Sequence, residues 1–377
     1  MKPLTSYLEK HQNDMLNDIQ TLVRAESPTH DIEAVNKCGQ ILSQLFNTHL
    51  GLRPEVIEQT ETANHLRFQI GEATEQILII GHFDTVWEHG SLPLMVKGNQ
   101  FFGPGAIDMK GGLVQAMWAV KALNEMNVNL EKSIVFLCNG DHEGIASPTS
   151  RPYIETEALK SDAVLVPEAP QGETGALKTS RKGVLRFTIT FHGIAAHSGN
   201  NHEAGASANH ELARQLIYLE SLTDYSRGTT VNAGQIHGGT SVNVIPDIAE
   251  LKIDIRVASN QEAERMNHLV QALQPFSSDV SLKVKGGIMR PVMERTEQTA
   301  TLFNIAKEAA QEMEMPLDEA AVGGGSDGSF ASALGIPTLD GLGAAGDGPH
   351  AEHEHILIDQ LPYRTSMMAQ VIKRLAE

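Results

Sequence analysis

The chain has 377 residues, more than one ordinary domain contains, so the sequence predicts two domains. Hydrophobic residues make up 41% of the sequence, which is enough to build packed cores and excludes a disordered chain. The formal net charge of −18 disfavours nucleic acid and anionic membranes as partners, because both would repel an acidic surface.

The first segment of the chain predicts an amphipathic helix rather than a signal peptide. Leucine, isoleucine, valine and methionine residues recur at helical spacing between positions 4 and 23, without a continuous apolar stretch. No segment of the sequence is long and apolar enough to span a membrane. The sequence has two cysteines, Cys38 and Cys138, too few for a disulfide framework or a thiolate metal cluster. We therefore expect a cytoplasmic protein.

Three short apolar runs, at 77–80, 134–138 and 164–166, predict buried strands. A helix with an apolar stripe is expected between the first two, beginning near Lys110. Strand, helix and strand at this spacing indicate an α/β sheet built from βαβ units. Ligands of such sheets bind beyond the carboxyl ends of the strands, so the polar residues that follow the three runs are candidates for a functional site.

The middle of the chain has a different pattern. Apolar and polar residues alternate over 187–191 and 251–257, which predicts half-buried antiparallel strands, and helical stripes separate them. This mixture predicts an inserted α+β domain over residues 180–286. Residues 1–179 and 287–377 are expected to form one α/β domain, with further helices near 301–313 and 361–375.

Histidine, aspartate and glutamate residues gather in the loops after these strands. His82 and Asp84 follow the first run, and their i, i+2 spacing in extended chain directs both side chains to one side. Asp84 is thus placed to orient the imidazole of a metal ligand. Asp108 lies at the start of the expected helix, either as its N-cap or as a carboxylate that bridges two cations.

Three more loops carry the same chemistry. Asp141, His142 and Glu143 follow the second run, Glu168 follows the third, and His350 lies near the end of the chain. Each loop alone is compatible with an ordinary solvated loop, but several such loops after buried strands favour a metal site. Carboxylates and imidazoles without thiolates suit zinc, cobalt or manganese. Two such ions roughly 3.5–4 Å apart can activate a water and polarise an amide carbonyl.

With these motifs in this order, the chain resembles the di-zinc peptidase and deacylase family of bacterial glutamate carboxypeptidase, acetylornithine deacetylase and succinyl-diaminopimelate desuccinylase. The resemblance implies a catalytic domain with a mixed sheet and helices on both faces, and an inserted lid or dimerisation domain. It also implies the roles of six residues: His82 and Glu168 hold one zinc, Glu143 and His350 hold the other, Asp108 bridges both, and Asp84 orients His82 during catalysis.

The inserted segment resembles the family too. His197, within residues 193–199, matches its signature, which implies a homodimer in which this histidine reaches the partner's active site. Asn243 and Arg256 match positions that contact substrate, and residues 323–327 resemble the loop that lines the substrate carboxylate site. Arg290 matches a residue of the glutamate-releasing branch, where an arginine suits bidentate recognition of a carboxylate. A surface arginine beside a turn proline is the alternative for Arg290.

The resemblance breaks at one loop. The family's general base is the first Glu of an Asp-Glu-Glu run, which is followed by one residue and then Gly-Ser. Residues 141–147 read Asp-His-Glu-Gly-Ile-Ala-Ser, with one extra residue. Anchored on Asp141, His142 takes the position of the base and Glu143 keeps the ligand position. Anchored on Ser147, Glu143 becomes the base and Gly144 replaces the ligand. We prefer the first register, because losing a ligand would empty a metal site whereas an imidazole can accept a proton.

The sequence therefore predicts a zinc-dependent metallopeptidase resembling glutamate carboxypeptidase. Its expected substrates are small N-acyl amino acids or dipeptides with a free carboxylate. The first alternative is a catalytically impaired protein of the same fold that binds metal and ligand, since the base motif is altered at His142. A metallo-phosphoesterase with the same ligand types is the second alternative.

Overall fold

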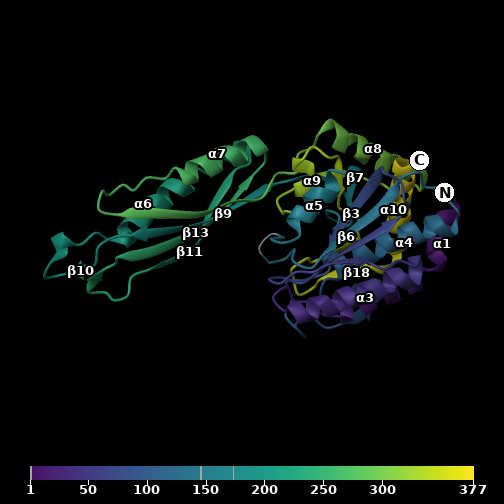
Figure 1. Cartoon of the computed structure of the whole chain (residues 1–377), viewed down its shortest axis with the longest axis horizontal. Helices are drawn as coiled ribbons and strands as arrows, with labels where there is room; N and C mark the ends of the chain where they lie inside the picture. The colour runs from purple at the N-terminus through teal and green to yellow at the C-terminus, as the bar shows by residue number, and fades with distance from the viewer. Residues whose placement is uncertain (1, 145–146, 173) are drawn as a thin grey trace. The chain divides into compact units, whose positions relative to one another are not determined.

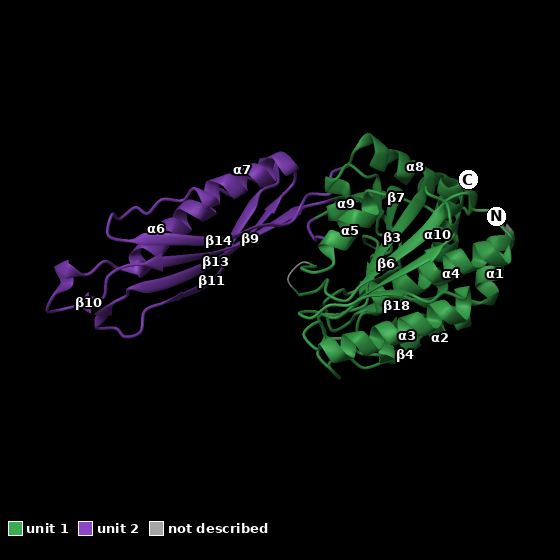
Figure 2. Ribbon diagram, in the orientation of Figure 1, with its two compact units in different colours: residues 1–180, 295–322, 326–377 green, residues 181–294, 323–325 purple. Residues whose placement is uncertain are grey.

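The computed structural model describes residues 2–144, 147–172 and 174–377. The chain divides into two compact units (Figure 2). The first comprises the chain up to Ser180 together with residues 295–322 and 326–377, and the second comprises residues 181–294 and 323–325. The second unit is thus inserted into the first. The α/β class expected from the sequence, with a mixed sheet and an α+β insertion, is confirmed.

An eight-stranded sheet forms the centre of the first unit (Figure 1). Strand β3 pairs in parallel with β6 and β7, β16 pairs in parallel with β7, and β2 pairs antiparallel with β6. In sheet order the strands are β1 (Glu55–Ile57), β2 (His65–Ile70), β6 (Ser133–Asn139), β3 (Gln76–His82), β7 (Ser161–Val166), β16 (Thr338–Asp340), β8 (Leu177–Arg181) and β15 (Glu319–Val322). The three apolar runs of the sequence are the buried central strands β3, β6 and β7.

The central strands are apolar throughout because both faces of the sheet are covered. Ile77 and Ile79 of β3 belong to the core beneath the large helices, whereas Leu78 and Ile80 belong to a second core. The helices of the first core are α1 (Lys2–Lys10), α2 (Gln12–Arg24), α3 (Ile32–Leu50), α4 (Gly111–Glu125), α8 (Glu297–Glu312) and α10 (Leu361–Ala376), and those of the second are α5 (Arg151–Ala158) and α9 (Gly328–Ala333).

The N-terminal helix differs from the expectation. The apolar stripe between Leu4 and Val23 is buried as predicted, but it lies on two helices, α1 and α2, that break at His11. The His11 ring contacts the Asp14 carboxylate at 2.7 Å. The stripe continues across the break because both helices pack on the same core. Within the described residues, no helix combines the length and apolarity needed to cross a bilayer.

A small second sheet joins two loops of the first unit. Its strands, in sheet order, are β17 (Gly346–Asp347), β18 (His355–Leu357), β5 (Gln100–Phe102) and β4 (Met95–Lys97). It holds the segment that precedes Asp108 against the segment that carries His350. A π-helical turn, η1 (Ala106–Lys110), leads from there into α4, and a short 3₁₀ turn, η4 (Ile358–Gln360), leads into α10.

The second unit is an antiparallel sheet with helices packed against it. Its sheet order is β11 (Thr230–Gly238), β13 (Ile248–Val257), β9 (Gly183–His192) and β14 (Ser281–Arg290). The alternating residues Phe187, Ile189 and Phe191 are buried as expected, in a core that they share with α6 (Ala208–Glu220) and α7 (Asn260–Gln271). The remaining elements are the paired strands β10 (Ala196–His197) and β12 (Val244–Ile245) and the 3₁₀ turns η2 (His202–Ala204) and η3 (Tyr225–Arg227).

Candidate metal centre

The carboxyl ends of the central strands bring the first candidate residues together. His82 is the last residue of β3 and lies in register with Asn139, the last residue of the parallel strand β6. Glu168 follows the end of β7, the other parallel neighbour of β3. The site therefore lies where sheets of this class bind their ligands.

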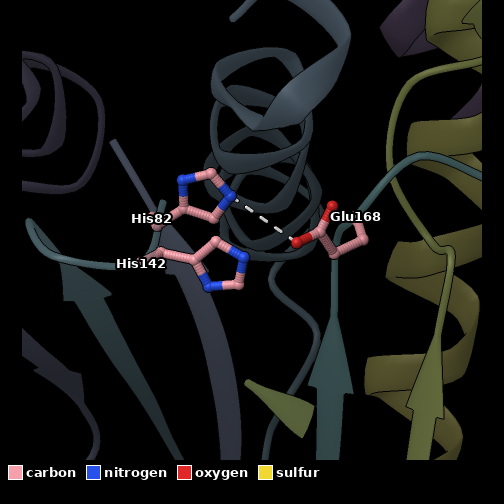
Figure 3. A group of neighbouring side chains, drawn as sticks. All are labelled: His82, His142 and Glu168. Carbon is pink, nitrogen blue, oxygen red and sulfur yellow. Dashed lines mark ion pairs between the residues drawn. The ribbon is translucent and has the colours of Figure 1, made fainter. Parts of the chain in front are cut away.

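His82 faces two carboxylates. Its Nε2 atom lies 3.3 Å from Oδ1 of Asp108. It also lies 3.6 Å from Oε1 of Glu168, the contact that Figure 3 marks with a dashed line. The imidazole is buried, and among the described residues its Nε2 has no hydrogen-bond partner. A buried nitrogen that points at two carboxylates without a hydrogen bond is the arrangement of a metal-ligand set.

His350 forms the second half of the centre. Its Nε2 atom lies 3.1 Å from Oδ2 of Asp108 and 3.0 Å from Oε1 of Glu143. The two oxygens of Asp108 thus face two different imidazoles, as a bridging carboxylate requires. Two ligand atoms about 2.0–2.1 Å from a tetrahedral zinc lie roughly 3.3 Å apart, so the observed separations fit an ion in each half.

The charges of the centre are strongly coupled. Burial alone would lower the pKa of His82, but the nearby carboxylates of Asp108, Asp84 and Glu168 outweigh burial and raise the pKa well above its usual range. Hydrogen bonds to Asp108 and Glu143 raise the pKa of His350 to about 10. The positive charge that the imidazoles can carry thus offsets the charge of the buried carboxylates. Divalent cations would take over that role and release the protons.

Asp84 contacts the second ring nitrogen of His82 and the main chain of the loop that carries His142 and Glu143. The Nδ1 atom of His82 lies 3.0 Å from the main-chain oxygen of Asp84 and 3.4 Å from its Oδ1. The Asp84 carboxylate accepts hydrogen bonds from the main-chain N–H groups of His142 (3.1 Å) and Glu143 (2.9 Å) and from the Thr29 hydroxyl (2.8 Å). Burial would raise the pKa of Asp84, but the hydrogen bond and charge of His82 lower it. One buried anion therefore orients both the His82 ring and the 142–143 backbone.

The three polar residues of the loop after β6, Asp141, His142 and Glu143, have different surroundings. The Asp141 carboxylate faces away from the centre and accepts hydrogen bonds from the main-chain N–H groups and hydroxyls of Thr149 and Ser150. Glu143 lies beside His350, and the His142 ring stacks on the ring of His82, with centroids 4.0 Å apart and planes at 5°. His142 and Glu143 thus both lie at the centre, whichever of the two registers applies. Ile145 and Ala146 are part of the stretch in which the two registers differ, and they lie outside the described residues.

Glu354 is a supporting residue whose role could not be recognised from the sequence. Its buried carboxylate accepts hydrogen bonds from the main-chain N–H groups of Gly105, Ile107 and Asp108 and from the Trp87 indole. Burial and the Asp108 charge raise its pKa to about 7. The one sequence signal was its position four residues after His350, which an ordinary solvated loop would share.

Gly112 fixes the Glu168 loop by close packing. A Cβ atom at Gly112 would lie 1.7 Å from the main-chain oxygen of Pro167, so only glycine permits this contact. The first turn of α4 therefore packs directly on the residue that precedes Glu168.

The four residues expected to bind substrate belong to the second unit and form two groups there. His197 and Asn243 are close neighbours, since Ser198 N–H donates to the Asn243 main-chain oxygen. Arg256 pairs with Asp254 and donates to the Gly323 main-chain oxygen at 3.4 Å.

Arg290 belongs to the second group. So does Arg181, which the sequence analysis did not single out. Both are buried. Arg290 lies against Gly325, and Arg181 donates to the main-chain oxygens of Gly324 and Gly325. Three arginines thus surround the glycine run 323–325.

Comparison with known proteins places this geometry in context. The family model described as peptidase family M20/M25/M40 matches residues 78–374. Carboxypeptidase G2 of Pseudomonas sp. (strain RS-16) is 28% identical over 375 residues, covering 96% of this chain and 89% of the relative.

Two solved structures share the fold. An M20 family metallo-carboxypeptidase of Sulfolobus solfataricus has a TM-score of 0.77 at 19% identity, covering 96% of this chain and 99% of that one. The YXEP protein of Bacillus subtilis, described as a dinuclear metal-binding peptidase, has a TM-score of 0.68 at 16% identity, covering 98% and 99%.

Proposed function

The chain belongs to peptidase family M20/M25/M40, and from this premise we propose that it is a zinc-dependent hydrolase of small N-acyl amino acids or dipeptides with a free carboxylate. Membership confirms the resemblance inferred from the sequence and the class of metal-dependent hydrolase. The observation that carries the proposal is Asp108, whose two oxygens face two separate groups of ligand atoms.

Two zinc ions are the proposed cofactors, with cobalt and manganese as alternatives. His82, Asp108 and Glu168 would hold one ion, and Asp108, Glu143 and His350 the other. Bound there, the pair would polarise the amide carbonyl and lower the pKa of the attacking water. The distances between these ligand atoms, 3.0–3.6 Å, support this assignment.

His142 is the proposed general base. It would take a proton from the attacking water and deliver it to the leaving amine, while Asp84 holds His82 and the 142–143 backbone in place. In the second unit, Arg290 would bind the substrate carboxylate through bidentate hydrogen bonds, and Arg256, Asn243 and His197 would contact the substrate.

The organisation expected from the sequence remains part of the proposal. Residues 1–179 and 287–377 would form the catalytic domain, and residues 180–286 a lid and dimerisation domain through which His197 reaches the partner's site in a homodimer. A cytoplasmic location stays a prediction, in keeping with the two free, buried cysteines Cys38 and Cys138. Light scattering that found a monomer would remove the role of His197 across the interface.

A catalytically impaired metal- and ligand-binding protein is the second candidate function. The observation that favours it is the imidazole at position 142, where the family pattern has a carboxylate. The substitution His142→Glu separates the two candidates. An enzyme that already uses His142 should change little, whereas a rate gain of about 100-fold or more would show that the native loop is impaired.

The proposal is tested by release of free amino acid from a panel of N-acyl amino acids and dipeptides, with a phosphate ester as a further substrate. The function is supported if amino acid is released from the amides and a chelator abolishes this release. Hydrolysis that persists in excess chelator contradicts the metal mechanism, and turnover of the phosphate ester alone would favour a phosphoesterase.

A further inference from the structure

Asp327 lies at the start of α9 but does not cap that helix. Within the described residues, its side chain makes no hydrogen bond to the helix N-terminus, although aspartate at this position normally accepts one. The residue is 3% exposed. A buried carboxylate turned away from its own helix requires donors elsewhere.

Those donors come from the end of β6 and from the loop that follows it. Asn139 Nδ2 donates to Oδ2 of Asp327 at 2.8 Å, and the Ser147 hydroxyl donates to Oδ1 at 2.5 Å. The Nδ1 atom of His142 lies 3.1 Å from the same Oδ1. Asp327 therefore contacts both ends of the 142–147 loop and holds the ring of the residue at the base position.

This contact determines which nitrogen of His142 serves the metal centre. Nδ1 faces the Asp327 carboxylate, a contact that favours the tautomer with the proton on Nδ1 and the lone pair on Nε2. Figure 3 shows the rings of His82 and His142 parallel, with one nitrogen of each on the side of Glu168. Ligand atoms of these three residues all lie within 4.8 Å of one another. The unprotonated nitrogen of His142 is thus directed at the space between the ligands of the first ion.

We propose that Asp327 is a positioning residue that forms a His–Asp dyad with His142, an inference that rests on the proposed function. A glutamate base can accept a proton on either oxygen, whereas an imidazole works only when its protonated nitrogen points away from the reacting water. Replacing the carboxylate by His142 therefore requires an acceptor behind the ring, and Asp327 supplies it.

His142 would carry one proton from the attacking water to the leaving amine. As the water oxygen bonds to the carbonyl carbon, its proton moves to Nε2 of His142. When the carbon–nitrogen bond breaks, the same proton moves to the leaving nitrogen. Asp327 stays ionised throughout and stabilises the transient imidazolium, so the dyad ends as it began.

A double-mutant cycle tests the proposal in the zinc-loaded full chain. Asp327→Asn should lower kcat by about 10²–10⁴-fold, because an amide can donate to Nδ1 and favour the wrong tautomer, while KM changes little. In the His142→Glu background the same substitution should cost less than about tenfold, because no imidazole remains to be oriented. Equal losses in both backgrounds would mean that Asp327 supports the fold alone, and would overturn the proposal.

Two measurements do not depend on turnover. Nitrogen chemical shifts of ¹⁵N-labelled His142 should report a proton on Nδ1 in the native protein and on Nε2 in Asp327→Asn. A proton on Nε2 in the native protein would overturn the dyad even if the protein hydrolyses its substrate. Zinc content should stay at two ions per chain in His142→Gln, and a fall to one would show that His142 is a metal ligand instead. These measurements can thus contradict the dyad even if the protein is a hydrolase, and they can support the dyad even if no hydrolysis is found.

Discussion

Replacing Asp84 by asparagine should weaken metal binding although the side chain keeps its size. Its Oδ1 accepts from His142 N–H and faces Nδ1 of His82, and its Oδ2 accepts from Glu143 N–H and the Thr29 hydroxyl. The amide nitrogen of asparagine would face two donors in either orientation. We expect it to replace Oδ1, whose contacts are 3.1 and 3.4 Å, rather than Oδ2, whose contacts are 2.8 and 2.9 Å.

A hydrogen bond to a charged group contributes about 1.5–3 kcal/mol, so losing the one from the His142 N–H costs roughly that much before the structure relaxes, and losing the charge beside Nδ1 of His82 adds to this cost. Part of this cost lowers the free energy of unfolding, and part appears as 10–100-fold weaker metal affinity, typical of a residue that orients a ligand.

Competition titration with a chromophoric chelator measures the metal affinity, and urea denaturation of the metal-free protein measures the stability. The matched control is Asp162→Asn, which removes the same charge from an exposed pair with Lys132. The control should keep native affinity. Metal affinity of Asp84→Asn within about twofold of the native value would refute the role of Asp84 in orienting His82.

Three further substitutions probe other parts of the first unit. His350→Gln should lower bound zinc from two ions per chain to one, measured by elemental analysis, because it removes a ligand from one half only. Gly112→Ala should lower the free energy of unfolding by about 3 kcal/mol or more and weaken metal binding, since its Cβ would clash with the Pro167 main-chain oxygen. Glu157→Gln should cost about 1 kcal/mol at pH 7 by urea denaturation, and the difference should vanish in acid. Burial would raise the Glu157 pKa, but hydrogen bonds led by that of Lys160 lower it, so its stabilisation is present above pH 4.5 and is lost as pH falls through the lower native pKa.

The first two of these have controls in the same chain. His353→Gln changes an exposed histidine near His350 and should keep both ions. Gly287→Ala adds a methyl group where the nearest atom is 3.4 Å away, and should be tolerated. Two zinc ions in His350→Gln, native stability in Gly112→Ala, or a Glu157→Gln deficit that persists at pH 3 would each contradict the corresponding reasoning.

The strands and the ligand loops could be predicted because they depend on local patterns. The run Ile77–Ile80 is apolar at every position, and such a run signals a strand covered on both faces. His82 ends β3, Asp108 lies in the turn that leads into α4, and Glu143 lies in the loop after β6, so α/β topology brings them to one edge of the sheet.

The supporting contacts could not be predicted because they join residues far apart in the chain. Asp327 and His142 meet where the residue before α9 contacts the end of β6 and the loop that follows it, and no periodicity in either segment records that contact. Glu354 likewise acts on the Asp108 loop through a small sheet that pairs β5 with β18. In the sequence, Gly112 looks like any glycine at the start of a helix. Its contact with the Pro167 oxygen is visible only in the structure.

Hydrolysis as a function of added zinc tests the central claim most directly. Metal-free protein would be titrated with zinc, and release of amino acid from an N-acyl amino acid would be followed together with bound metal. Two coupled half-sites that share Asp108 predict no release from the metal-free chain and full activity at two ions per chain. Release at an undiminished rate from protein shown to hold no metal would contradict the account.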